Sequence, residues 1–431
     1  MPKPANTAVI DSSVSPTQSQ QPQKTQSSFN QTPNPPPSPP PISEPNLWVK
    51  LTIGIIGLFA FLQVYSIQAI LPVIMQEFQA TETQVGMTVG ATVMAIALMS
   101  PFMGMLSDAI GRRVLIIAAI VLLGIPTALI GFADSLSMIT LWRFIQGLAV
   151  PGITVVTIAY VGEEFGGKSV ARLMSYYVSG TVLGGFLGRF ILGHLQELIG
   201  WRQGFILMGA ATLIGAAWVW WQLPRSRHFV ANPNIASSLQ MLKNHSQNRY
   251  VVTACLLGIC VLFSLVGCFT FINLHLSAAP YHLSSAGLAN IFTVYLLGVV
   301  ITPIASQLIS KFGAARMVRV AVVISMLGVL LTLAQPLWLI IIGLAVMSSG
   351  VFITQSATIT YIAVNVKEGR SLASGLYYMC YYLGGTLGAW ACGLAFTQGR
   401  WALTVWTLLA VQVVALLLAI FGMVKMKKPS A

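Results

Sequence analysis

The sequence reads Gly104-Met105-Leu106-Ser107-Asp108-Ala109-Ile110-Gly111-Arg112-Arg113 at the point where one long apolar run ends and the next begins. Asp108 and the two arginines must lie in water, at the membrane face that collects positive charge. Gly104 and Gly111 permit close helix approach and a tight reversal, and Asp108 can accept hydrogen bonds from the next helix N-terminus. The stretch predicts a short basic turn between two membrane-spanning helices.

Composition places most of the chain in lipid. Hydrophobic residues make up 56% of the 431 residues and charged residues only 8%, whereas a soluble protein has about a quarter of its residues charged. The five cysteines all lie in apolar runs, so we expect no disulfide framework. A Gly-Lys phosphate loop, a metal-ligand cluster and a nucleophile–base constellation are all missing from the sequence. We therefore expect no enzyme, no metal site and no cofactor.

Twelve runs supply close to the ~20 apolar residues that a helix needs to cross hydrocarbon. The runs are continuously apolar and do not alternate over ~10 residues, which favours helices over a barrel. The fold class expected is therefore an all-α membrane protein. The predicted spans are Leu47–Leu71, Gln84–Ser107, Val114–Phe132, Leu136–Val161, Val170–Leu192, Trp201–Leu223, Tyr250–Ile272, Ser285–Ile309, Val318–Ala334, Leu337–Ile362, Ser371–Phe396 and Trp401–Val424.

The spans divide the chain into five segments. Residues 1–46 hold 12 of the 22 prolines, with Ser and Gln filling much of the rest, a composition typical of a disordered tail. Residues 47–223 and 250–424 are expected to be two six-helix bundles. Residues 224–249 are the expected central cytoplasmic linker, and residues 425–431 a basic cytoplasmic C-terminal tail.

The distribution of charge predicts the orientation. With twelve spans and a cytoplasmic N-terminus, 19 of the 23 Lys and Arg fall on the cytoplasmic side, as the positive-inside rule requires. We expect a multi-pass protein of a bacterial-type plasma membrane (inner membrane) with both termini in the cytoplasm. The net charge of +13 then reflects topology, so nucleic acid is not an expected partner. The expected partners are the lipid bilayer, a small-molecule substrate and protons, and we expect a monomer.

The second half of the sequence repeats the first at an offset of 200 residues. The turn has a weaker echo, in which Gly111 corresponds to Gly313 and Asp108 is replaced by Ser310. These matches predict a duplication of six helices, a plan that places a substrate site between the halves near mid-membrane. The residues Tyr177, Leu183, Gly184, Gly185, Leu187, Gly188 and Trp201 recur as Tyr377, Leu383, Gly384, Gly385, Leu387, Gly388 and Trp401.

Two arginines, Arg143 and Arg189, lie inside predicted spans. An arginine in the membrane costs ~2.5–3.5 kcal/mol on insertion scales, so each needs a partner or a role. Arg143, with Gln146 one turn later, either satisfies carbonyl groups of a neighbouring kinked helix or takes part in coupling or anion attraction. Arg189 either reaches the outer membrane face or has a similar coupling role.

Two further patterns have both a functional and a structural interpretation. Glu163 and Glu164 close the fourth span, where paired carboxylates relay protons or simply form a solvated helix end. Small residues in the fifth and eleventh spans predict close helix packing. These residues are Gly180, Gly184, Gly185 and Gly188, and Gly384, Gly385 and Gly388.

The middle third of every predicted span lacks Asp, Glu and Lys. The intramembrane arginines therefore leave the centre positive, which favours a polar or anionic substrate over a lipophilic cation. Polar stripes at helical spacing are candidates for the substrate cavity, although such stripes serve equally as contacts between helices. The candidates are Gln63, Tyr65, Gln68, Asn290, Tyr295, Thr354, Thr358, Tyr361, Tyr377 and Tyr381.

Several of these patterns resemble motifs of the major facilitator superfamily. Gly104, Leu106, Asp108, Gly111, Arg112 and Arg113 are similar to its signature loop, with Ala109 where a basic residue is usual. Residues 143–147 resemble a second motif. Residues 180–189 resemble the fifth-span motif of its antiporters, with Gly184-Gly185 in place of the usual Gly-Pro pair. Residues 160–164, 184–189 and 223–229 look like the YnfM-like branch of bacterial inner-membrane transporters, grouped with efflux permeases.

The resemblance implies twelve helices in two pseudo-symmetric six-helix bundles that work by alternating access. It makes proton-coupled efflux of a drug, sugar or metabolite, with antiport, the leading expectation. A uniporter or an uptake symporter for a polar or anionic solute is the alternative within the class. A non-transporting membrane receptor is the alternative from another class, and it would need an output domain that the composition of residues 1–46 does not supply.

Overall fold

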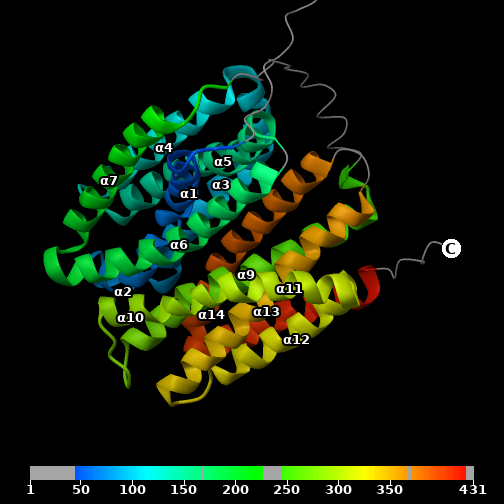
Figure 1. Cartoon of the computed structure of the whole chain (residues 1–431). Coiled ribbons are helices and arrows are strands. Elements are labelled where there is room, and N and C mark those ends of the chain that lie inside the picture. Colours follow the sequence, from blue (N-terminus) through cyan, green and yellow to red (C-terminus); the bar gives the residue numbers. More distant parts are fainter. Residues whose placement is uncertain (1–43, 167, 227–244, 367–369, 424–431) are drawn as a thin grey trace, which may run out of the picture. The chain divides into compact units, whose positions relative to one another are not determined.

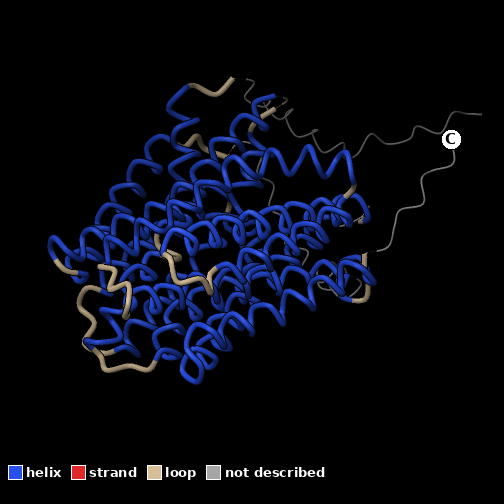
Figure 2. Tube along the Cα trace, turned by 90° about the horizontal axis from the view of Figure 1, so that it is seen from below, coloured by secondary structure: helices blue, strands red, loops and turns tan. Residues whose placement is uncertain are grey.

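The computed structural model describes residues 44–166, 168–226, 245–366 and 370–423, which belong to one compact unit. Most of the expected N-terminal tail, most of the expected linker and the whole expected C-terminal tail lie outside these residues. Within the described residues all regular structure is helical (Figure 2).

Sixteen helical elements follow one another along the described chain (Figure 1). The first group is α1 (Leu47–Leu62), η1 (Ser66–Ile70), α2 (Leu71–Glu77), α3 (Glu82–Ile110), α4 (Arg112–Ile130), α5 (Leu136–Glu164), α6 (Lys168–Ile199) and α7 (Trp201–Gln222). The second group is α9 (Arg249–Ser277), α10 (Ser285–Ile291), η2 (Phe292–Leu296), α11 (Leu297–Phe312), α12 (Ala314–Leu331), α13 (Leu337–Asn365), α14 (Arg370–Leu417) and η3 (Leu418–Gly422).

Ten helices in the described part of the chain are long and apolar enough to cross a membrane. One of them, over residues 372–422, has 51 residues and passes through non-helical backbone at Gly399 and Arg400. Since a crossing needs only ~20 residues, this segment is two spans. The bent pair Leu47–Leu62 and Ser66–Glu77 forms one more span. The described residues thus provide the twelve predicted spans, and the all-α prediction is confirmed.

The first span differs from the uninterrupted run that the sequence predicts over Leu47–Leu71. Helix α1 ends at Leu62, and η1 and α2 continue from Ser66 to Glu77 after a 45° bend. Pro72 favours irregular backbone here, because proline lacks an N–H and its ring clashes with the carbonyl four residues earlier. The freed carbonyl groups of the break find a partner on another helix, as described below.

Two glycines with positive φ make equivalent turns in the two groups of helices. Gly111 (φ 103°) separates α3 from α4, and Gly313 (φ 83°) separates α11 from α12. Backbone of this kind favours glycine, so the sequence echo between these positions has a structural basis. We call the membrane face at these two turns the signature end, and the other face the opposite end.

Glycines bring α6 onto α1 and α14 onto α9 with backbones in contact. A Cβ atom on Gly180, Gly184 or Gly188 would lie 2.0, 2.1 or 1.8 Å from a carbonyl oxygen of α1, at Gly54, Leu58 and Leu62. In the second group, Gly384 and Gly388 face the carbonyl oxygens of Ile259 and Phe263 at 2.2 and 2.4 Å, and Gly385 packs on the side chains of Leu262 and Val266. Gly185 instead faces Arg189, 3.8 Å away.

Candidate functional site

At the signature end, Arg112 connects the turn between α3 and α4 to the end of α5. Its Nη2 lies 2.5 Å from Oδ1 of Asp108 and 2.8 Å from Oε1 of Glu163, and its Nε also donates to Glu163. Arg113 donates from Nε to the carbonyl oxygen of Leu223, 2.8 Å away, just beyond α7. The two arginines therefore tie together four helices. Glu164, next to Glu163, is buried at 1% exposure, so the pair is not simply a solvated helix end.

Asp108→Asn tests the role of this network. The side chain of Asp108 is 39% exposed, so its ion pair contributes little to folding, and we expect the variant to reach the membrane normally. A switching role for the loop predicts that transport falls by about tenfold or more, because Asp108 holds Arg112 in place beside Glu163, where α3, α4 and α5 meet. Ser310→Ala is the matched control, since Ser310 occupies the equivalent position and only donates to Gln307 in its own helix. Wild-type flux in Asp108→Asn would remove the network from the mechanism.

Arg143 of α5 is fully buried and holds the break in the first span. Its Nη1 donates to the carbonyl oxygen of Gln63 at 2.5 Å and to Oε1 of Gln146 at 2.9 Å. Its Nη2 donates to the carbonyl oxygen of Val64, and its Nε to that of Thr88 at 3.3 Å. Four acceptors thus surround one guanidinium. This geometry supports the interpretation that Arg143 satisfies carbonyl groups of a kinked neighbour.

Arg189 of α6 is also buried, at 1% exposure, and does not reach the membrane face. Its Nε donates to Oε1 of Gln68, 2.7 Å away, and its Nη1 donates to the carbonyl oxygen of Gly185. Three aromatic rings surround its Cζ, with centroids 4.7 Å away for Tyr65 and 4.5 Å for both Phe292 and Tyr295. We call these rings with Gln68 and Arg189 the arginine cage. Cation–π contacts of this kind contribute up to about 2 kcal/mol each when desolvated.

The arginine cage joins the two groups of helices. Tyr65 and Gln68 come from the first span, while Phe292 and Tyr295 come from η2 in the second group. Gln68 also donates to Thr270 of α9, 2.9 Å away. Both η1 and η2 are short 3₁₀ segments within longer spans, a feature that often marks a hinge or a functional position.

A close crossing separates the arginine cage from the opposite end. A Cβ atom on Gly193 of α6 would lie 2.5 Å from Cβ of Ala289 and 2.7 Å from the carbonyl oxygen of Ser285. Beyond this crossing is a cavity of about 340 Å³, whose lining includes Gln76, Gln196, Glu197, Ser277 and Ser284. The close approach of α6 and α10 thus lies between the cage and this cavity.

The other cavity candidates are spread over the molecule. Gln63 points into the first group, where its Nε2 donates to Thr212 at 3.1 Å, and Asn290 is exposed. The hydroxyl groups of Thr354 and Thr358 donate to carbonyl oxygens of their own helix. Thr354 also lines a cavity of about 20 Å³, room for about one water molecule.

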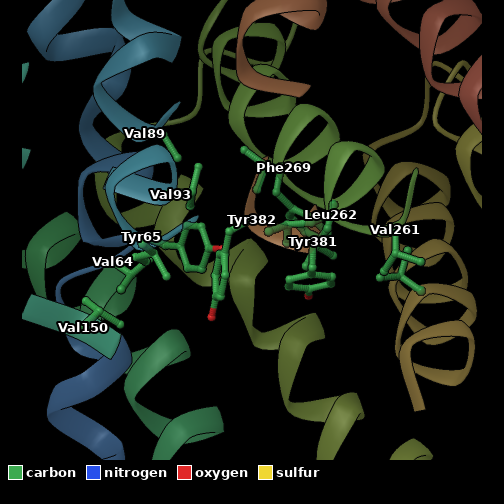
Figure 3. Packing of buried hydrophobic residues seen from close by; sticks show 14 of the residues in the cluster. Val64, Tyr65, Val89, Val93, Val150, Val261, Leu262, Phe269, Tyr381 and Tyr382 are labelled. Atoms are coloured by element: carbon green, nitrogen blue, oxygen red, sulfur yellow. The ribbon is translucent and has the colours of Figure 1, made fainter. Parts of the chain in front are cut away.

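Tyr361 packs against Tyr250, and Tyr377 and Tyr381 belong to a row of tyrosines on α14. This row continues with Tyr378 and Tyr382. Figure 3 shows Tyr65, Tyr381 and Tyr382 within one buried cluster that also contains Phe269. The structure therefore brings Tyr65, Gln68, Arg189 and Tyr295 together, and it leaves Gln63, Asn290, Thr354 and Thr358 elsewhere.

Sequence reasoning missed Phe292 and Thr270 as members of this region. Phe292 lies three residues before Tyr295, so the two share a helix face, but phenylalanine is common in this chain and gives no distinctive signal. Thr270 lies in a run of apolar residues, where its only sign of function was its polarity.

Hydrogen bonds and ion pairs between the two groups lie at the opposite end or around the cage, as far as the described residues extend. Arg400 pairs with Glu82 at 2.9 Å, and Thr397 donates to the same carboxylate. Glu197 of α6 accepts from the backbone N–H of Ala286 in α10 at 2.8 Å. Thr386 donates to the carbonyl oxygen of Gly90. The two groups are thus held together at this end.

Comparison with known proteins agrees with these features. Residues 53–289 and 256–431 match the sequence profile of the Major Facilitator Superfamily. The inner membrane transport protein YnfM of Escherichia coli (strain K12) is 30% identical over 373 residues, 84% of this chain and 89% of that protein. An uncharacterized transporter of Buchnera aphidicola subsp. Schizaphis graminum is 29% identical over 342 residues, 79% of this chain and 82% of that protein.

Shorter matches relate the chain to proteins with named substrates. The sialic acid transporter NanX of Escherichia coli (strain K12) is 27% identical over 129 residues, covering 30% of this chain and 32% of that protein. The multi-drug resistance efflux pump PmrA of Streptococcus pneumoniae is 29% identical over 134 residues, covering 30% and 33%.

Solved structures share the fold. A bacterial homologue of the human lysosomal transporter Spinster, crystallised in an inward-facing and occupied conformation, superposes with a TM-score of 0.72 at 16% identity, over 87% of this chain and 96% of that one. The profile match spans nearly all of the membrane-embedded residues, and the twelve spans agree with the predicted architecture. The chain is a multi-pass membrane protein that belongs to the major facilitator superfamily of transporters, as its motifs indicated.

Proposed function

We propose that this protein is a secondary active transporter that moves a small molecule by alternating access. Residues 47–223 and 250–424 act as the two bundles, residues 224–249 connect them, and both termini lie in the cytoplasm. The signature end then faces the cytoplasm, in accordance with the positive-inside distribution of Lys and Arg. Export of a drug, sugar or metabolite against inward proton flow is the leading form of this transport.

One observation carries the proposal: the two groups of helices are joined at one end of the membrane. The Glu82–Arg400 ion pair, the Glu197–Ala286 hydrogen bond and the crossing at Gly193 all lie on the opposite-end side of the arginine cage. A molecule bound at the cage would be shut off from that side. Transport requires these contacts to break while others form at the signature end.

Glu197 is our candidate for proton coupling. Coupling requires a group whose proton affinity differs between the two states. Glu197 contacts the other group of helices by accepting a hydrogen bond from the N–H of Ala286. Opening the opposite end would remove this partner, so the proton affinity of Glu197 would change with conformation.

Uptake or uniport of a polar or anionic solute is the second candidate. It is supported by the two buried arginines and by the partial similarity to a sialic acid transporter. The partial similarity to a multidrug efflux pump favours export.

Reconstitution into liposomes with an imposed pH gradient tests the function. We expect flux of at least one compound from a panel of metabolites and drugs, accelerated by a gradient that brings protons in from the opposite end. Glu197→Gln should retain flux down a substrate gradient but lose the acceleration. Gln84→Glu, an exposed change at the same end of the molecule, is the control for altered surface charge. Gradient-dependent flux in Glu197→Gln would exclude this carboxylate, and specific ligand binding without any flux would favour the receptor.

A further inference from the structure

Of the two arginines that are buried in the described chain, Arg143 uses more of its hydrogen-bonding capacity than Arg189 does. A guanidinium carries five N–H donors. All three nitrogen atoms of Arg143 donate, to four acceptors in total. Arg189 donates only from Nε and once from Nη1, and its Nη2 has no acceptor among the described residues. No carboxylate in the described chain pairs with Arg189. Its charge is balanced only by ring faces and two neutral oxygens.

Three N–H donors of Arg189 remain, one on Nη1 and two on Nη2, because Gln68 uses Nε and Gly185 uses one donor of Nη1. A carboxylate can accept two hydrogen bonds from one guanidinium. One guanidinium offsets one negative charge. The other arginine that is buried in the described chain, Arg143, already donates to four acceptors. These features favour a monocarboxylate over a phosphate.

The surroundings of Arg189 suit the remainder of such a molecule. The faces of Tyr65, Phe292 and Tyr295 already lie within 4.7 Å of the guanidinium, and aromatic faces stack readily on planar or apolar groups. Because the rings come from both groups of helices, a ligand here would contact both. This is the position that alternating access requires of a substrate.

We propose that Arg189 binds the carboxylate of the transported molecule, with Tyr65, Phe292 and Tyr295 packing around its less polar part. Gln68 is a positioning residue, because it accepts from Nε of Arg189 and donates to Thr270 and so orients the guanidinium. This proposal rests on the transport function proposed above, and it specifies the substrate class.

Matched pairs of small molecules test the proposal on the purified full-length protein. Benzoate, nicotinate and gluconate are each compared with their carboxamides by thermal shift and by isothermal titration calorimetry. The wild type should bind at least one carboxylate more tightly than its carboxamide. Arg189→Gln should weaken that carboxylate by about 100-fold and abolish the preference, since an unpaired carboxylate is costly in a buried site. Arg319→Gln is the matched control, because Arg319 donates only to Ala315 in its own helix.

Arg189→Lys keeps the inference testable if the glutamine variant does not fold. Lysine retains the charge but not the planar fork, so the preference for the carboxylate should persist with affinity reduced by about tenfold. Equal binding of each carboxylate and its carboxamide by the wild type would overturn the proposal. An undiminished preference in Arg189→Gln would overturn it as well.

Counterflow in liposomes separates this inference from the proposed function. If a carboxylate binds through Arg189 but never crosses the membrane, the proposed binding site stands and the proposed transport function is refuted. If a compound is transported and Arg189→Gln does not change its flux, the transport function stands and the proposed binding site is refuted.

Discussion

Leucine at both Gly104 and Gly375 is expected to trap the protein with its opposite end closed, while leaving it folded. A Cβ atom on either glycine would have nothing within 4 Å, and neither residue has a positive φ. The present conformation therefore gives no steric reason for glycine at these two positions. We infer that the reason lies in the other state of the transport cycle.

The geometry of α3 and α14 indicates what that state looks like. At the opposite end these helices already pack through small residues: Cβ atoms built on Gly86 and Gly90 would lie 3.3 and 3.2 Å from Ala389, and one on Gly393 would lie 2.9 Å from Cα of Thr83. Gly104 lies eighteen residues after Gly86, and Gly375 eighteen residues before Gly393. Eighteen residues are about five helical turns, so Gly104 and Gly375 lie on these same helix faces. Rocking the helices would bring the two glycines together at the signature end.

Each leucine should raise the free energy of that alternate state by about 1–3 kcal/mol through overpacking, a shift of roughly five- to 150-fold in the equilibrium. Spin labels at Gln84 and Gln398, both exposed and on the two helices concerned, report the equilibrium without a known substrate. The double variant should show a single short distance, whereas the wild type should show a second, longer one under transport conditions. Unfolding temperature should not change.

Gly162→Leu is the control for this pair, because Gly162 is exposed and also has nothing within 4 Å of its Cβ position. It lies on α5, outside the face shared by α3 and α14. A wild-type distance distribution in the Gly104→Leu/Gly375→Leu variant would show that the signature end closes by different contacts.

The number of spans followed from the sequence because the length requirement of a membrane crossing is local: each run of apolar residues satisfies it without reference to any other. The turn at Gly111 could also be predicted from the sequence, because backbone with positive φ favours glycine. The break in the first span was not predicted from Pro72 alone, because the freed carbonyl oxygens of Gln63 and Val64 need donors from Arg143, a distant residue of α5.

The arginine cage could not be predicted from the sequence either, because its residues come from distant parts of the chain. Charge within a span marks Arg189 as a candidate. Polarity marks Tyr65, Gln68 and Tyr295, but it marks Gln63, Asn290, Thr354 and Thr358 equally, and the structure places these four elsewhere. Polarity within a span does not say which face of the helix meets which neighbour. That depends on long-range packing, here the approach of α6 to η1 and η2.

Replacing Arg143 with methionine is expected to unfold or strongly destabilise the protein, and this separates the two interpretations of that residue. The change leaves the carbonyl oxygens of Gln63, Val64 and Thr88 and the amide oxygen of Gln146 without their donor. Hydrogen bonds within membrane proteins average ~0.6 kcal/mol, and buried groups left unsatisfied cost about 1–3 kcal/mol each. The four together should therefore cost at least about 2 kcal/mol, visible as a lower unfolding temperature in detergent.

A role of Arg143 in coupling predicts a change in flux and no change in stability. If its charge attracts a substrate or responds to protons, the methionine variant should keep its unfolding temperature, and its flux should no longer follow a pH gradient. Arg143→Lys sharpens the distinction, because a single ammonium group keeps the charge but cannot reach acceptors spread over the first span, α3 and α5. A structural role predicts that lysine is also destabilising, and a coupling role predicts that lysine restores the pH response. Arg319→Met, which removes an arginine bonded only within its own helix, sets the baseline for both measurements.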